Sequence, residues 1–413
     1  MDNPGELGLV DTPAEADGEQ EPKQDPLGVM GFPTEPKKEA PPPEAKVSEK
    51  AVPKLKVGEL DEHHTILDLL AEVLERGASD LHLTAGAPPH LRIDGELQPL
   101  DLPKYVPSNL KELIYSMMHE KQIKTFEMER EFDFAYSLKN VGRFRVNVFY
   151  QRGSLGCVIR AVPTNKQSIK ALGLPPKTEE LIMLPRGIIF VTGPTGSGKS
   201  TSLAAMIDYI NDHRNCHIIT IEDPIEFLHN HKHCLVNQRE LGQDTDSYAK
   251  ALRHVLRQDP DVILVGELRD IESMGTAITA AETGHLVLTT LHTNDAAQTI
   301  DRIIDVFPPH QQAQVRLQLA NSLQAIFCQT LCRRIQGGRV MAYELLTATN
   351  AVRNLIREGK IHQIPATIET GQKSGMRTMN ATLLELVRKN IVTREEARAH
   401  ATNPAEFDKL FSL

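Results

Sequence analysis

The chain has 413 residues and a formal net charge of −9, which leaves room for two or three domains with an acidic balance overall. Motors that move along nucleic acid more often carry a basic excess, so this charge argues against DNA or RNA as a partner. The N-terminus lacks the basic start and apolar core of a signal peptide, and no segment reaches the ~18 apolar residues of a membrane-spanning helix. Five scattered cysteines indicate a reducing compartment. We therefore expect a cytoplasmic protein that is not inserted directly into a membrane.

Residues 1–59 differ in composition from the rest of the chain. They hold 10 of the 26 prolines, many charged residues and almost no aromatic ones. Such a segment cannot bury enough apolar surface to offset the entropy lost on ordering, so it is predicted to be a disordered acidic tail. Its role is open between a docking peptide and a solvated linker.

Residues 60–163 are predicted to form a small α+β domain, with a linker at 164–172. Hydrophobic periodicity predicts helices and strands in turn. The expected helices span 66–77 and about 109–119, and the expected strands span 79–86, 132–138, 142–152 and 156–163. Residues 88–100 are predicted to form two further short strands joined by a turn at Asp94-Gly95. Arg143, Arg145 and Arg160 alternate with apolar residues, so they are expected to project from one face of the strands. Solubility would explain one such arginine, whereas several on one face suggest a functional surface.

The most informative motif is G-x-x-x-x-G-K-S at residues 193–200. An apolar run at 186–192 leads into it and a helix-compatible stretch at 200–210 follows, which is the strand–loop–helix context of a phosphate-binding P-loop. In such a loop the backbone N–H groups and the start of the helix face an oxyanion. We expect Lys199 to reach the β- and γ-phosphates of a nucleotide and Ser200 to hold Mg²⁺. The predicted nucleotide-binding residues are Gly193, Pro194, Thr195, Gly196, Ser197, Gly198, Lys199, Ser200 and Thr201.

Residues 173–413 alternate strands with helices, which predicts an α/β domain with a parallel sheet. Ligands bind such sheets at the carboxyl ends of the strands. Glu226, Glu267 and His292 follow three successive predicted strands, so they are expected to meet at the edge that carries the P-loop. From residue 308 onward the chain is expected to be mostly helical apart from 339–346. Cys328 and Cys332 are accordingly placed on a helix, as core thiols.

These polar residues match the needs of ATP hydrolysis, which requires Mg²⁺, a carboxylate near the attacking water and cations facing the phosphates. Glu267, in the Walker B position, is expected to contact the Mg²⁺ shell or the water, and Glu226 is the second candidate. Two nearby carboxylates can divide these roles in either way, so the identity of the general base stays open. His292 is expected to report on the γ-phosphate through a neutral imidazole donor. For His285, two roles stay open: packing in the core, or a function in the nucleotide site.

Four segments carry a resemblance to a known family. They read GPTGSGKST, HIITIEDPIEF, ALRHVLRQDPDVILVGELRD and AAETGHLVLTTLHTNDAAQTIDR. In this order they resemble the Walker A, Asp, Walker B and His boxes of the secretion ATPase superfamily. Three further segments, ASDLHLTAG, GRFRVNVF and AVRNLIREGK, are similar to those of the PilT type, the twitching-motility ATPases that power type IV pilus retraction. The resemblance covers residues 60 to about 400.

The resemblance implies a homohexamer at the cytoplasmic face of the inner membrane, built from a PAS-like N-terminal domain and a RecA-like ATPase domain. It implies ATP and Mg²⁺ as cofactors. The implied partners are the inner-membrane platform protein of the pilus machine and, as a further candidate, a paralogous pilus ATPase. It implies that Arg145 and Arg160 close onto the phosphates and that Arg253 and Arg257 belong to the site and its interfaces. Residues 351–358 are implied to serve retraction rather than hydrolysis.

The sequence was also weighed against four alternative functions. Extension and secretion members typically carry a four-cysteine zinc-binding segment, and the sequence has no C-x-x-C pair, which argues against an extension ATPase. Residues 148–156, 241–252 and 403–413 lean toward the accessory paralog PilU, so the choice between a primary motor and that form stays open. A RecA-type nucleic-acid translocase is disfavoured by the acidic balance and the absence of tryptophan. A non-hydrolysing scaffold is disfavoured because both Glu226 and Glu267 are present.

Overall fold

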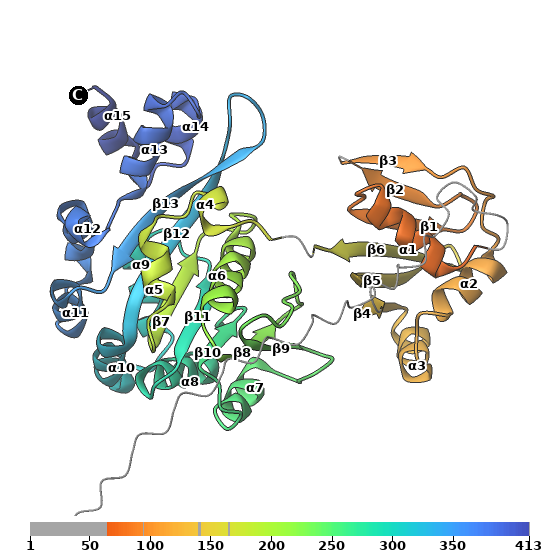
Figure 1. Cartoon of the computed structure of the whole chain (residues 1–413), viewed down its shortest axis with the longest axis horizontal. Helices are drawn as coiled ribbons and strands as arrows, with labels where there is room; N and C mark the ends of the chain where they lie inside the picture. Colours follow the sequence, from red (N-terminus) through yellow and green to blue (C-terminus); the bar gives the residue numbers. More distant parts are fainter. Residues whose placement is uncertain (1–63, 94, 139–141, 164–165, 413) are drawn as a thin grey trace, which may run out of the picture. The chain divides into compact units, whose positions relative to one another are not determined.

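The computed structural model describes residues 64–93, 95–138, 142–163 and 166–412 (Figure 1). The predicted tail at 1–59 lies outside the described residues. The described chain contains a six-stranded sheet followed by a seven-stranded sheet. This mixture of helices and strands confirms the α/β class predicted from the sequence.

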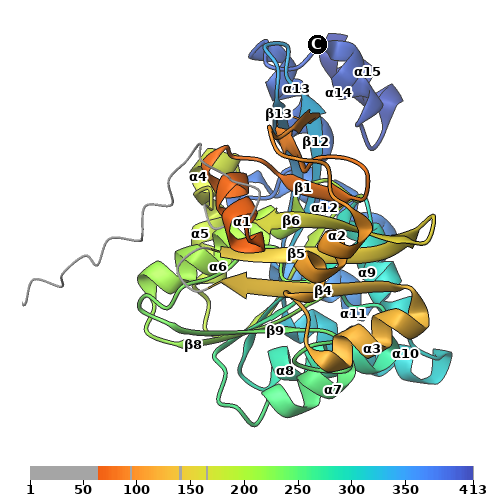
Figure 2. The same ribbon diagram turned by 90° about the vertical axis from the view of Figure 1, so that its right-hand side faces the viewer.

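The first sheet is antiparallel, with the strand order β3-β2-β1-β6-β5-β4. Figure 2 shows β4, β5 and β6 side by side as long strands. Arg145 lies directly opposite Arg160 in the β5–β6 ladder, so the two share one face, as predicted. The elements are α1 (Ile66–Glu75), β1 (Asp80–Thr84), β2 (His90–Ile93), β3 (Glu96–Pro99), α2 (Pro107–Tyr115), α3 (Glu120–Glu129), β4 (Glu131–Leu138), β5 (Gly142–Gln151) and β6 (Ser154–Val162).

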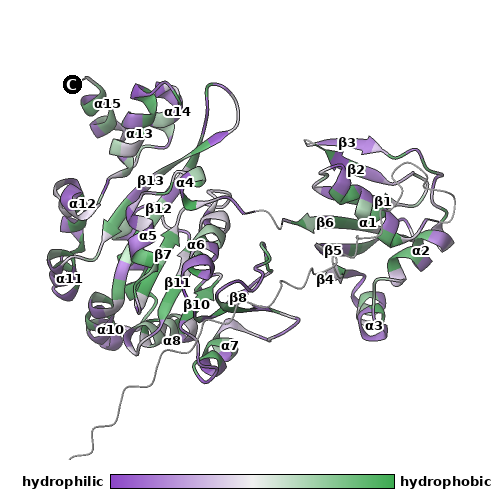
Figure 3. Cartoon of the chain, viewed as in Figure 1, coloured by the Kyte–Doolittle hydropathy of each residue, from purple (hydrophilic) through white to green (hydrophobic). Residues whose placement is uncertain are grey.

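The second sheet has the strand order β13-β12-β7-β11-β10-β8-β9, and its pairs are parallel except for β12–β13. Every residue of β7, β10 and β11 is buried, because helices cover both faces of a parallel sheet. Figure 3 shows β7 and β11 hydrophobic along their length. The strands are β7 (Gly187–Thr192), β8 (His217–Glu222), β9 (Leu235–Glu240), β10 (Val262–Val265), β11 (Leu286–Leu291), β12 (Leu323–Arg333) and β13 (Arg339–Thr347).

Helices cover both faces of this sheet, and each face packs against its helices through its own hydrophobic cluster. One face packs against α4 (Ile169–Leu172), α5 (Lys177–Ile182) and α6 (Lys199–His213). The other face packs against α7 (Tyr248–Val255), α8 (Ile271–Glu282), α9 (Ala296–Asp305), α10 (Pro309–Ser322), α11 (Asn350–Arg357) and α12 (Ile364–Thr370). Helix α8 begins directly after Asp270, whose side chain accepts a hydrogen bond from the Ser273 N–H at 2.8 Å and so caps the helix.

The last helices form a separate cluster around the far end of the β12–β13 pair (Figures 1 and 2). They are α13 (Met379–Arg388), α14 (Arg394–Ala399) and α15 (Pro404–Ser412), and one-turn 3₁₀ segments at Ile361–Gln363 and Gln372–Ser374 precede them. The prediction that Cys328 and Cys332 lie on a helix is wrong, since both belong to strand β12. The apolar run of β12 is buried on both sides, and periodicity alone cannot distinguish such a strand from a buried helix.

Candidate functional site

A pocket of about 760 Å³ opens at the carboxyl ends of β7, β8, β10 and β11. The P-loop lines it, together with residues that follow each of the other three strands. The structure thus brings Lys199, Glu226, Glu267 and His292 together in the lining of one pocket. Their convergence follows from the parallel register, which places the ends of neighbouring strands at one edge.

Glycine is required in the P-loop for steric as well as conformational reasons. Gly193 has φ 139°, and a Cβ there would lie 2.2 Å from the carbonyl oxygen of Gln329. Gly198 has φ 90° and immediately precedes α6, so the helix begins at Lys199. The Lys199 ammonium donates to the carbonyl oxygens of Gly193 at 2.8 Å and Pro194 at 3.0 Å. These bonds hold the lysine head group over the loop that it is expected to serve.

Gln329 of β12 supports the P-loop and was missed by the sequence analysis. The residue is 2% exposed, and its side-chain amide donates to the carbonyl oxygen of Ser197 at 2.8 Å. Gln329 also presents the carbonyl that excludes a side chain at Gly193. No local pattern could have revealed this role, because it depends on the parallel pairing of β12 with β7.

Glu267 is held between two basic groups after strand β10. Its carboxylate lies 2.8 Å from Nη2 of Arg269 and 3.3 Å from Nε2 of His292. Desolvation alone would raise the pKa of Glu267, but the hydrogen bond from Arg269 and the charges of His292 and Arg269 outweigh it, so the pKa is lowered. Glu267 is therefore a carboxylate at neutral pH. Arg269 had no place in the sequence prediction, although it stands two residues after the predicted acid.

Two further acids enter the pocket from the end of β8. Glu222 accepts hydrogen bonds from Thr220 at 2.7 Å and Gln238 at 3.0 Å, and desolvation raises its pKa. Glu226 is exposed to solvent at the pocket wall. Desolvation lowers the pKa of Lys199, while the charges of Glu267 and Glu226 oppose that shift. The lysine therefore lies within the electrostatic reach of both candidate acids.

The two arginines predicted from the first sheet form other contacts. Nη2 of Arg145 donates to the carbonyl oxygens of Ile225 at 3.0 Å and Pro224 at 3.4 Å, next to Glu226 in the chain. Nε of Arg160 donates to Asp80 at 2.7 Å. Neither arginine is among the described residues that line the pocket.

Three predicted residues outside the P-loop also do not line the pocket, and within the P-loop the same holds for Gly193, Pro194 and Ser197. Arg253 on α7 pairs with Glu272 at 3.2 Å, and both side chains are exposed. Arg257 follows the same helix. His285 precedes β11, so it lies at the amino end of the strand, and its Nδ1 is 3.0 Å from the carbonyl oxygen of Ala280. The fold of a single chain therefore does not place Arg253, Arg257 and His285 at the P-loop.

The side chains of the pocket suit a magnesium nucleotide. Hydroxyl and carboxylate oxygens are the ligands that Mg²⁺ prefers, and Ser200 and Glu267 supply one of each. Within the described ranges, no group of three or more His, Cys, Asp or Glu residues could hold a metal unaided. A pair such as Ser200 and Glu267 fits an ion that takes one or two ligands from the protein and the rest from phosphates and water.

Comparisons with known proteins give the same result as the motifs. The family described as Type II/IV secretion system protein matches residues 61–399. The chain belongs to this family. It is 50% identical over 342 residues to the type IV pilus retraction ATPase PilT of Pseudomonas aeruginosa, covering 83% of this chain and 99% of that protein. It is 42% identical over 346 residues to the type IV pilus ATPase PilU of the same organism, covering 84% of this chain and 91% of PilU.

A solved structure agrees with this assignment. The crystal structure of the pilus retraction motor PilT with bound ADP has a TM-score of 0.79 and 51% sequence identity, and the match covers 84% of this chain and 99% of that one. The chain is therefore a PilT-type secretion ATPase, and its second sheet belongs to a RecA-like P-loop fold. The resemblance to the PilT type, noted from the sequence motifs, is confirmed.

Proposed function

We propose that this protein couples the hydrolysis of Mg-ATP to type IV pilus retraction, and so to twitching motility. The observation that supports this most is that Lys199, Glu267 and His292 line one pocket in a chain 50% identical to PilT over 99% of that protein. The proposal keeps the predicted division into residues 60–163, a linker at 164–172 and an ATPase domain at 173–413.

In this proposal the P-loop N–H groups and Lys199 bind the phosphates. Mg²⁺, held by Ser200 and the carboxylate side of the pocket, would neutralise charge on the β- and γ-phosphates. Glu267 orients or deprotonates the attacking water. Its lowered pKa keeps it ionised at neutral pH but makes it a weak base, which favours the orienting role. Glu226 is the second candidate for the same role, and His292 contacts the γ-phosphate.

The predicted residues that do not line the pocket are proposed to assist from outside it. Arg145 already contacts the segment that carries Glu226, and we propose that it and Arg160 meet negative charge that develops on the transferring phosphoryl group. Arg253 and Arg257 are exposed on or after α7, where a second subunit can reach them. His285 is kept as a supporting residue of the nucleotide site.

We further propose a homohexamer at the cytoplasmic face of the inner membrane, docked on the platform protein of the pilus machine and able to act with a paralogous pilus ATPase. No helix in the described part of the chain has the length and apolar character needed to cross a membrane. Docking on the platform protein would hold the ATPase at the membrane without a spanning helix in this part of the chain. Nucleic acid has no role in this proposal.

The alternative is an accessory PilU-like role. The identity of 42% to PilU is below the 50% to PilT, so the primary motor is favoured. The deciding experiment is complementation in a strain that lacks both PilT and PilU, with twitching scored on a surface. A primary motor restores retraction alone, whereas an accessory ATPase requires a second one.

Lys199→Ala tests the chemistry. Removing the ammonium withdraws charge from the phosphates, and phosphate release from ATP should fall by about 100-fold or more. Lys170→Ala is the matched control, because Lys170 is exposed on α4. Turnover should be unaffected by added DNA. Normal turnover in Lys199→Ala would refute the proposed site, and strong stimulation by DNA would favour a nucleic-acid translocase.

A further inference from the structure

Two of the five cysteines lie side by side at the amino ends of neighbouring strands. The β8–β9 ladder is parallel and pairs His217 with Leu235, so the preceding residues, Cys216 and Cys234, fall opposite each other. The Leu235 N–H donates to the carbonyl oxygen of Cys216 at 3.0 Å, which continues the ladder to this point. The two sulfur atoms are 3.2 Å apart.

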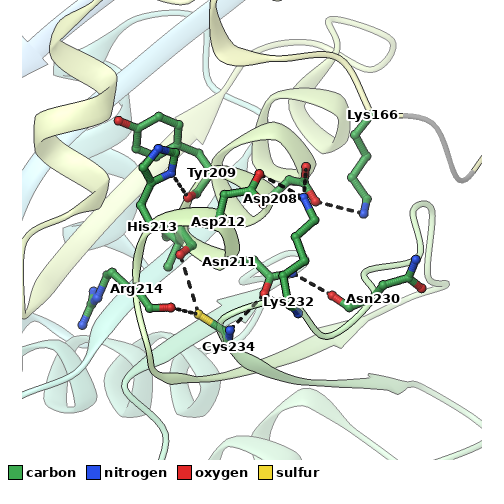
Figure 4. Close-up of polar contacts among 11 residues, drawn as sticks. Lys166, Asp208, Tyr209, Asn211, Asp212, His213, Arg214, Asn230, Lys232 and Cys234 are labelled. Carbon is green, nitrogen blue, oxygen red and sulfur yellow. Dashed lines mark hydrogen bonds and ion pairs between the residues drawn. The ribbon is translucent and has the colours of Figure 1, made fainter. Parts of the chain in front are cut away.

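The backbone around Cys234 is fixed by helix α6. The buried Asn211 side chain accepts hydrogen bonds from the N–H groups of Lys232 and Cys234, each at 3.2 Å, and donates to the carbonyl oxygen of Asn230 at 2.7 Å. The thiol of Cys234 donates to the carbonyl oxygen of Arg214 at 2.9 Å. Figure 4 shows Cys234 next to Asn211 and Arg214 in this arrangement.

We propose that Cys216 and Cys234 are a modification site, a dithiol that small-molecule disulfides oxidise to an intramolecular disulfide. Adjacent parallel strands lie about 4.8 Å apart. That spacing is within the range of about 4.4–6.8 Å between the Cα atoms of a disulfide, so the backbone need not move. Cys216 is partly exposed and can meet a small disulfide, whereas Cys234 is buried behind it.

The reaction balances in two exchange steps. The thiolate of Cys216 attacks one sulfur of the small disulfide, forming a mixed disulfide and releasing one thiol. The sulfur of Cys234, having given its proton to solvent, then attacks the Cys216 sulfur and releases the second thiol. The protein loses two protons and two electrons, and the small disulfide takes them up as two thiols.

The bond would close a ring that contains strand β8 and the whole crossover to β9. Glu222, Asp223 and Glu226 lie within that ring and line the pocket. Oxidation would therefore join the two ends of the segment that carries these acids. This modification is independent of the proposed function, because it depends on the ladder and not on nucleotide.

Burial raises the pKa of Cys216 to about 12, and the hydrogen bond and charge of Cys234 add to the effect. A raised thiol pKa means that the reactive thiolate is scarce at neutral pH, so the first step is slow and depends on base. Its rate should rise about tenfold per pH unit between pH 7 and 9, because the thiolate fraction does so well below the pKa.

The test uses the full-length protein and 2-hydroxyethyl disulfide, followed by alkylation, proteolysis and mass spectrometry. We expect a linked peptide pair that joins Cys216 to Cys234, with its yield rising with pH and its thiols returning with dithiothreitol. Cys157, Cys328 and Cys332 are buried elsewhere and serve as internal controls that remain free thiols.

Two variants separate the steps. Cys234→Ser should stop at a stable mixed disulfide on Cys216, and Cys216→Ser should leave Cys234 unmodified because it is buried. The wild-type result is decisive even if a variant fails to fold. A persistent mixed disulfide in the wild type, a link between two chains or a rate that does not change with pH would each overturn the proposal.

Discussion

Gln329 of β12 donates a hydrogen bond to the carbonyl oxygen of Ser197 at 2.8 Å and so joins the P-loop to a strand 132 residues away. The glutamine is buried, and the loop carbonyl that it satisfies faces the sheet rather than the pocket. The hydrogen bond therefore holds the loop on the side away from the pocket, where a bound nucleotide cannot replace it.

We predict that Gln329→Met weakens nucleotide binding. Methionine keeps the volume but removes the donor, and a net hydrogen bond contributes about 1 kcal/mol, which corresponds to roughly a fivefold rise in the dissociation constant. Isothermal titration with a non-hydrolysable ATP analogue measures this change. Gln311→Met, on the exposed surface of α10, is the control and should bind as the wild type does. Equal affinities in both variants would show that the bond to Ser197 does not shape the loop.

The Arg269–Glu267 pair predicts a specific pH dependence. The pKa of Glu267 is lowered in the folded protein, so the carboxylate and its stabilising pair persist above the unfolded pKa and are lost as pH falls through the lowered value. Arg269→Ala removes the hydrogen bond and the charge that offset desolvation. The acid limb of kcat/KM against pH should therefore move to higher pH in this variant.

Arg388→Ala, a change to an exposed arginine on α13, is the control for this profile. Its acid limb should coincide with that of the wild type. If Arg269→Ala also left the limb in place, Glu267 would not be the ionisation that limits activity at low pH, and Glu226 would become the stronger candidate.

Arg145 and Arg160 should differ in their effects on turnover and binding. If they meet charge in the transition state, replacing either by Ala lowers kcat more than it changes nucleotide affinity. Lys124→Ala, at an exposed position on α3, should change neither. If hydrolysis in both arginine variants stayed within about twofold of the wild type, they would be ordinary surface charges.

Arg353 forms its contacts inside the chain, although the family resemblance implies that its segment, residues 351–358, serves retraction. Its guanidinium donates to the carbonyl oxygens of Ala320 and Asn321, the last of which is 2.9 Å away, and so satisfies the C-terminal end of α10. Arg353→Ala should lower the free energy of unfolding by about 1–2 kcal/mol. Urea denaturation followed by circular dichroism measures it.

Arg357→Ala is the matched variant on the same helix. Arg357 contacts the side chains of Asn321 and Asn354 at the surface, so its loss should cost less than about 0.5 kcal/mol. A larger cost for Arg357 than for Arg353 would contradict the capping role. Twitching in the Arg357→Ala strain then reports on coupling without the complication of a destabilised fold.

Local patterns predicted the parts of this site that the chain encodes locally. The P-loop spacing and the acids after buried strands depend on neighbouring residues, so they could be predicted directly from the sequence. Strand β12 could not, because an apolar run buried on both sides has no periodicity of its own. The support from Gln329 and the pairing of Cys216 with Cys234 depend on strand order, which the sequence alone left undetermined.

The place of β12 in the sheet also bears on when the protein becomes competent during synthesis. A ribosome that has released residues up to Ser322 has delivered the P-loop, α6 and all the pocket acids, but β7 is still an edge strand, paired with β11 on one side and open on the side that β12 will cover. Only when β12 emerges does Gln329 reach Ser197. The nascent chain therefore carries every residue proposed to contact phosphate well before it can hold the P-loop in position. A premature stop in that interval would leave an open edge strand prone to aggregation rather than an enzyme with reduced activity.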